Sequence, residues 1–95
     1  MVLGVVELEL LIPESGSLKE KRSIVKRVVN RTRSRFNVTI AEVGKQDVRS
    51  RAVVGCAMVG SDRRYVNGAV DKLISFVEGL SLAEILDARI EIVNF

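Results

Sequence analysis

The apolar residues of this 95-residue chain repeat with two different periods, and the order of these periods along the chain restricts the possible folds. In four segments they alternate with polar or small residues, which is the pattern of a strand with one buried face. In two longer segments they recur every three to four residues, which is typical of an amphipathic helix. The strands are expected at residues 2–12, 37–43, 51–59 and 88–93, and the helices at 18–35 and 62–79.

This βαββαβ order predicts an α+β protein with a ferredoxin-like fold. Two helices with one apolar stripe each can both pack on one face of a four-stranded antiparallel sheet. Strands 2–12 and 51–59 are the most apolar, which suits the two central positions. The opposite sheet face stays open and only partly polar, because Leu3, Val5 and Leu11 point to it with every second residue of 51–59. The core is expected to include Val25, Val28, Val29, Val66, Val70, Leu73 and Val77.

The first helix has a recognisable start and one apolar stripe. Ser17 and Glu20 have the spacing of a capping box, in which both side chains accept hydrogen bonds from unpaired backbone N–H groups. The loop of residues 15–17 could also bind an anion at the helix N-terminus, but a cap and turn explains the same residues better. Lys21 lies closer to the apolar side, where its alkyl chain can cover apolar surface while the charge reaches water. The buried stripe is expected to contain Leu18, Val25, Val28, Val29, Thr32 and Phe36.

Length and composition favour a single domain spanning residues 1–95. Hydrophobic residues make up 47% of the chain and charged residues 28%, with one proline, whereas disordered segments are poorer in apolar residues. The N-terminus lacks the basic region of a signal peptide, and no apolar run reaches the ~18 residues of a membrane-spanning helix. We therefore expect a soluble cytoplasmic protein.

The sequence offers little for catalysis. It contains no histidine, which removes the usual proton-transfer group near neutral pH and the commonest metal ligand. Its one cysteine, Cys56, lies in an apolar stretch and is expected to be a buried, unreactive thiol. Residues 12–18 do not reproduce the glycine-rich phosphate loop of an acylphosphatase-like enzyme. We therefore expect no enzymatic activity and no cofactor.

Three acidic residues could in principle gather a divalent cation. Glu7 and Glu9 share one face of the first strand, and Glu42 lies on the second strand. Carboxylate oxygens are suitable ligands for hard cations. Ordinary surface acids that pair with neighbouring basic residues explain the same pattern better, so no metal site is expected.

The strongest charge asymmetry lies in the first helix. Residues 17–35 hold eight of the fifteen Lys and Arg residues and one acid, so this segment is net +7 and the remainder net −4. Like charges four residues apart cost a few tenths of a kcal/mol, and the helix accepts three such pairs, so stability alone does not explain them. Clustered Lys and Arg neutralise phosphates, which favours a nucleic-acid partner over a merely solvated face. The candidate contacts are Lys19, Arg22, Lys26 and Arg33 on one flank of the apolar stripe and Arg27, Arg31 and Arg35 on the other.

Three segments, in the same order, resemble the YlxP-like family of small bacterial proteins of unassigned function. They are Ser17-Leu-Lys-Glu-Lys-Arg22, then residues 35–43 with Gln46-Asp47 and Arg51-Ala52, and finally Ser61-Asp-Arg63. The resemblance implies a ferredoxin-like fold. Members are often encoded beside translation-initiation and ribosome-maturation factors, which points towards RNA or ribosomes. Many relatives have an aromatic residue where this chain has Val48-Arg49-Ser50.

Two functional hypotheses follow. RNA-recognition modules of this topology stack bases on aromatic residues of the central strands, whereas segments 2–12 and 51–59 contain none. RNA or ribosome binding would then proceed through phosphate contacts from the first helix. The other hypothesis is a protein-interaction or homodimerising module that acts through the partly apolar open sheet face.

Overall fold

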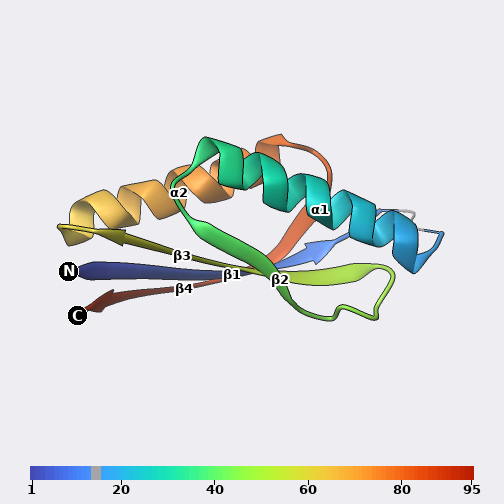
Figure 1. The fold of residues 1–95 in the computed structure, drawn as a ribbon, viewed down its shortest axis with the longest axis horizontal. Helices are drawn as coiled ribbons and strands as arrows, with labels where there is room; N and C mark the ends of the chain where they lie inside the picture. Colours follow the sequence, from blue (N-terminus) through green and yellow to red (C-terminus); the bar gives the residue numbers. More distant parts are fainter. Residues whose placement is uncertain (14–15) are drawn as a thin grey trace.

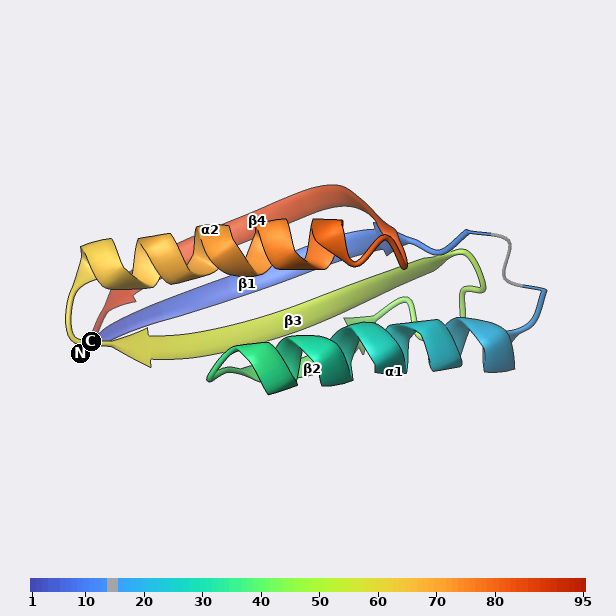
Figure 2. The same ribbon diagram turned by 90° about the horizontal axis from the view of Figure 1, so that it is seen from above.

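The computed structural model describes residues 1–13 and 16–95 and contains six elements in the predicted order. Figure 1 shows both helices on one side of the sheet, and Figure 2 shows α1 over its β2 side and α2 over its β4 side. The ferredoxin-like α+β fold is therefore confirmed. The elements are β1 (Val2–Leu11), α1 (Leu18–Arg35), β2 (Thr39–Gly44), β3 (Arg51–Gly60), α2 (Arg63–Gly79) and β4 (Glu84–Asn94).

The sheet has the strand order β2-β3-β1-β4, and every neighbouring pair is antiparallel. β1 and β3 occupy the two central positions, as their apolar sequences predict. They pair over their full length, from Val2 opposite Gly60 to Leu11 opposite Arg51. This continuous register aligns the buried residues of both strands on the face that the helices cover.

The two edge strands differ most from their expected bounds. β4 begins at Glu84 rather than at residue 88. Within this additional part the register shifts between Glu9 and Leu10, and Leu86 is left as an extra residue. Such a bulge interrupts the alternation by which a strand is recognised in a sequence. β2 begins at Thr39 rather than at residue 37, and its register shifts at Val43.

The seven core residues expected in the helices are all buried. They pack against inward residues of the central strands, among them Val6, Leu10, Val54 and Met58. Leu18 and Phe36, the two ends of the expected α1 stripe, are only half-buried. Phe36 packs edge-on against Phe76 of α2, with ring centroids 5.5 Å apart.

Two glycines let α2 approach the sheet closely. A Cβ added at Gly4 of β1 or at Gly60 of β3 would lie 2.7 Å from a methyl group of Val66. Real Cβ atoms do not come this close to another carbon, so the fully buried Val66 sits directly on the strand backbone. The first turns of α2 therefore depend on both glycines.

Within residues 1–13 and 16–95, no helix is long and apolar enough to cross a membrane. Residues 14 and 15, which include part of the loop considered for anion binding, lie outside the described residues.

Candidate nucleic-acid interface

Helix α1 begins where its sequence predicts. The Ser17 side chain accepts a hydrogen bond from the backbone N–H of Glu20 at 3.1 Å, and the Glu20 carboxylate accepts one from the backbone N–H of Gly16 at 3.0 Å. The last turn carries Arg33 and Arg35, whose charges interact favourably with the C-terminal end of the helix dipole. Both ends of the basic helix are thus fixed by its own residues.

Lys21 is not the partly solvated side chain that its position suggested. Its side chain is fully buried, and Nζ donates to Glu42 Oε2 at 2.6 Å and to the backbone carbonyls of Lys45 and Gln46 at 3.0 and 3.2 Å. These three acceptors use all three ammonium hydrogens. Lys21 therefore fastens α1 to β2 and to the loop after it, and it is not available to a ligand.

The same loop makes two weaker contacts with the start of α1. Arg22 lies 3.7 Å from the Asp47 carboxylate, and both side chains are exposed, so this ion pair contributes little to stability. Arg49 donates to the backbone carbonyl of Gly16 at 3.3 Å. Two of the segments that carry the family resemblance, residues 17–22 and Gln46-Asp47, therefore meet in space.

The seven cations predicted as phosphate contacts are all exposed, and they lie on two flanks of α1. Arg22 and Arg33 mark the flank that faces β2, because Arg33 also donates to the backbone carbonyl of Ile40 at 3.1 Å. Arg35 marks the flank that faces α2, because its guanidinium carbon lies 5.8 Å from the centroid of the Phe76 ring. We call these the β2-side flank (Lys19, Arg22, Lys26, Arg33) and the α2-side flank (Arg27, Arg31, Arg35).

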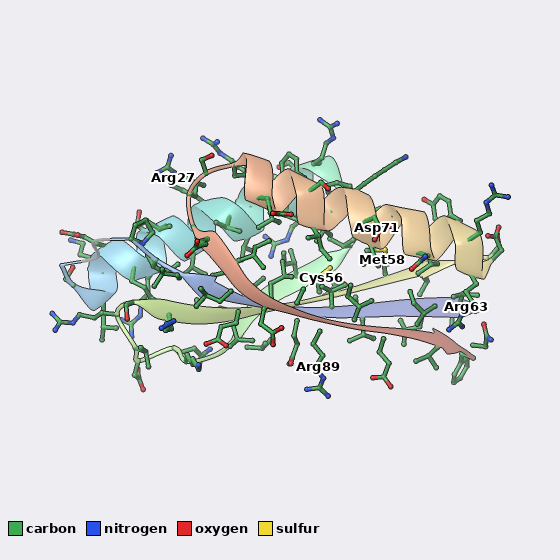
Figure 3. All side chains as sticks on the ribbon, turned by 180° about the vertical axis from the view of Figure 1, so that it is seen from behind. Arg27, Cys56, Met58, Arg63, Asp71 and Arg89 are labelled. Atoms are coloured by element: carbon green, nitrogen blue, oxygen red, sulfur yellow. The ribbon has the colours of Figure 1, made fainter. Side chains whose placement is uncertain are left out.

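Four of the seven cations have no partner among the residues that the structure describes. Within the described part of the chain, Lys19, Lys26, Arg27 and Arg31 form no ion pair and donate no side-chain hydrogen bond. Glu20 is the one acid of α1 itself. Figure 3 shows Arg27 pointing away from the sheet on the helical side of the molecule. These four charges are therefore free to contact an anionic partner.

Two adjoining open hollows lie between the C-terminal halves of the two helices, and both are lined by Arg35 and Phe76. The cations that line them are Arg31 and Arg35 from α1 and Lys72 from α2. This site could not be predicted from the sequence, because its residues come from two helices that are far apart along the chain. We call it the interhelical groove. Its lining residues are Asn30, Arg31, Ser34, Arg35, Phe36, Asp71, Lys72, Ser75, Phe76 and Leu80.

The structure does not bring the three candidate cation ligands together. Glu42 points towards the helices and pairs with Lys21, whereas Glu7 and Glu9 lie on the opposite, outer face of the sheet. Glu7 pairs with Arg89 at 3.4 Å, and Glu9 pairs with Lys45. The hydrogen bond from Lys45 lowers the pKa of the Glu9 carboxyl. Both outer acids are thus surface groups with basic neighbours.

The outer sheet face carries both apolar and charged residues. Leu3, Val5 and Leu11 point to it, as predicted, and so do the alternate β3 residues. Val59 and Val43 are 59% and 52% exposed, and a shallow hollow lies over Gly55 between Val5 and Val43. Glu7 and Glu9 lie between Val5 and Leu11 on the same face of β1, and Figure 3 shows Arg89, the partner of Glu7, pointing away from the sheet.

Cys56 lies on the inner face of β3 and is buried, as expected. Burial raises the pKa of its thiol to about 11. The thiolate is the nucleophilic form of cysteine. At neutral pH this cysteine is therefore protonated and enclosed.

Comparisons with known proteins agree on the family and on the fold. A family model described as "Protein of unknown function (DUF503)" matches residues 3–90. The uncharacterized protein YlxP of Bacillus subtilis (strain 168) is 36% identical over 90 residues, which cover 95% of this chain and 98% of that protein. A structural-genomics protein, YJCS, has a TM-score of 0.61 at 15% identity, with 97% and 99% of the two chains covered. The de novo designed protein Foldit4 has a TM-score of 0.53 at 13% identity, with 99% and 97% covered, and both structures show the fold alone.

Proposed function

The chain belongs to the family described as "Protein of unknown function (DUF503)", and we propose that it is a non-catalytic RNA- or ribosome-associated protein that binds phosphates through α1. The observation that carries this proposal is a set of exposed cations without a partner among the described residues, namely Lys19, Lys26, Arg27 and Arg31. Like charges on neighbouring turns repel each other and do not stabilise the helix. Because they are exposed on α1, they can instead contact the phosphates of a polyanion. Phosphate contacts of this kind are largely independent of base sequence.

The chemistry of the described residues supports binding rather than catalysis. General acid–base and nucleophilic catalysis need a titratable group near neutral pH or an activated nucleophile. The chain has no histidine, and its Cys56 thiol is buried and protonated at neutral pH. Lys21, the one buried cation among the described residues, is fully used by its three acceptors.

RNA binding measured against salt concentration tests the proposal. Four neutralised phosphates on a single strand give a slope of log affinity against log salt of about −3. We expect Lys26→Glu with Arg27→Glu to weaken binding for every RNA sequence and to flatten the slope. These side chains are exposed, so the fold is retained and can be checked by circular dichroism.

A matched control has the same change in charge at another place. Arg63→Glu with Arg64→Glu alters two exposed residues in the first turn of α2, where acidic residues interact favourably with the helix dipole. This variant should bind RNA far better than the α1 variant. Equal binding by both variants, or no binding by the wild-type protein at low salt, would show that the basic face is only a solvated surface.

A second candidate function is homodimerisation through the outer sheet face. It is favoured by the apolar residues of this face, where Leu3, Val5 and Val53 are half-buried and Val43 and Val59 are exposed. Apolar patches of this kind on small proteins mark interaction surfaces. Light scattering at micromolar concentrations should show a dimer whose association does not weaken with salt. A monomeric mass that stays constant up to high concentration would contradict this second function.

A further inference from the structure

The interhelical groove has a fixed aromatic floor. The rings of Phe36 and Phe76 meet edge to face, with an interplanar angle of 74°. The guanidinium carbon of Arg35 lies over the Phe76 ring, 5.8 Å from its centroid, in the range of a cation–π contact. Arg35 is exposed although it makes this contact, so its guanidinium is held at the groove and still reachable from outside. Arginine planes held in this way are platforms on which unpaired bases stack.

The charge of the groove favours an anion. Arg31, Arg35 and Lys72 face it, and Asp71 is the one acid among its described lining residues. Arg27 continues the row beyond the groove, because Arg27, Arg31 and Arg35 follow one another at four-residue spacing. Four residues advance about 6 Å along the helix axis. The α2-side flank therefore offers a row of cations that leads into the aromatic site.

The opposite flank lacks these properties. Arg22 is paired with Asp47, and Arg33 is bonded to the backbone of β2. No aromatic ring contact other than that of Phe36, Phe76 and Arg35 is present within residues 1–13 and 16–95. Phosphates can contact either flank, but of the two only the α2-side flank has an arginine over an aromatic ring.

We infer that the interhelical groove binds one unpaired nucleotide of a single-stranded RNA, with the base stacked on Arg35 over Phe76 and the flanking phosphates on Arg27, Arg31 and Lys72. This inference rests on the proposed function and specifies its partner. A base inside a duplex cannot reach the groove, because it is already stacked and paired. The protein should therefore prefer single strands to duplexes, which phosphate contacts alone do not require.

Fluorescence anisotropy with labelled oligo(A) RNA, alone and annealed to oligo(U), tests this inference. Arg35→Lys keeps the charge but removes the planar stacking surface. We expect it to weaken single-strand binding by about tenfold, as expected for loss of stacking with one base, and to leave duplex binding and the salt slope unchanged. Phe76→Leu should have the same effect, because it removes the ring that holds Arg35 in place.

Two control variants separate stacking from nonspecific damage. Tyr65→Leu removes an exposed aromatic residue from the opposite end of α2, and Arg64→Lys makes the same exchange as Arg35→Lys outside the groove. Both should bind like the wild type. Arg35 is exposed, so Arg35→Lys should retain the fold. It therefore tests the inference even if Phe76→Leu does not fold.

The outcomes distinguish the groove from the proposed function. Equal affinity of the wild type for single strand and duplex, or unchanged single-strand binding by a folded Arg35→Lys variant, would overturn the groove as a nucleotide site. Lys26→Glu with Arg27→Glu would then still report on phosphate binding by α1. If the wild type binds no RNA in either form, both the groove and the proposed function are refuted.

Discussion

Removing Glu42 should destabilise the protein far more than removing its partner, Lys21. Glu42→Leu leaves a fully buried ammonium with two backbone carbonyls as its remaining acceptors. Breaking a buried ion pair in this way costs about 3–5 kcal/mol. Because two of the three hydrogen bonds survive, we expect the lower end, about 3 kcal/mol. For a domain of this size, this corresponds to a melting temperature lower by about 15 °C.

Lys21→Met removes the charge and retains most of the side-chain volume. The Glu42 side chain is 18% exposed, so its carboxylate can be hydrated once its partner is gone. The remaining cost comes mainly from the backbone carbonyls of Lys45 and Gln46, and we expect a total of about 1–2 kcal/mol. The double variant Lys21→Met with Glu42→Leu contains no unpaired buried charge. It should therefore be more stable than Glu42→Leu alone.

Urea denaturation of the wild type, the two single variants and the double variant measures all four free energies of unfolding. The mid-points must be compared at equal m values, so that a change in the unfolded state is not taken for a change in stability. The reasoning is refuted if Glu42→Leu costs no more than Lys21→Met, or if the double variant is as unstable as the sum of the single variants.

Three further predictions use the same denaturation assay or simple chemical probes. Gly4→Ala should destabilise the protein by about 1–3 kcal/mol, because the added methyl group would overpack against Val66. Gly68→Ala in α2 should instead stabilise it by about 0.5–1 kcal/mol, because the added methyl group meets nothing within 4 Å. A loss of stability at both positions would contradict the close approach of α2. Cys56 should react with a thiol reagent at neutral pH only as fast as the protein unfolds, so rapid labelling of the native protein would show that the thiol is accessible. The pKa of Cys56 is raised from 9.0 to about 11 in the folded protein, so the thiol ionises more readily in the unfolded chain. The free energy of unfolding should therefore fall as the pH rises through this range, and Cys56→Val should lack the part of this decrease that Cys56 causes.

The fold could be predicted from the sequence because its buried residues keep a regular period. In β1, every second residue from Val2 to Leu10 is buried, and α1 buries Val25, Val28, Val29 and Thr32 at helical spacing. The alternation of buried and exposed residues is interrupted where the backbone is irregular. The extra residue Leu86 shifts the alternation of β4, so the strand could be recognised only beyond this bulge.

The Lys21–Glu42 pair could have been found from two exceptions to the same periods. Lys21 lies four residues before Val25 and seven before Val28, and Glu42 follows Ile40 on the buried side of β2. A charge at an apolar position in each of two neighbouring elements indicates a buried ion pair, since neither charge could be buried alone. Taken singly, Glu42 indicates a surface acid, and Lys21 indicates a side chain that covers apolar surface while its charge reaches water.

The interhelical groove could not have been predicted in this way. Arg35 and Phe76 are 41 positions apart, and neither breaks the pattern of its own helix. Their contact depends on the distance and direction of α1 relative to α2, which the period of either helix does not specify. The basic character of α1 is a property of the sequence, whereas the difference between its two flanks is a property of the packing.

The two proposed surfaces lie on opposite layers of the protein, and this arrangement determines how they can be separated. Figure 3 shows Arg27 on the helical side and Arg89 on the open side of the sheet. A dimer formed through the outer sheet faces would leave both copies of α1 exposed, on opposite sides of the assembly. Val59→Lys should then abolish dimerisation without weakening the affinity of each subunit for RNA, and high salt should release RNA without dissociating the dimer. If both activities were lost together in a folded variant, α1 and the sheet face could not be independent sites.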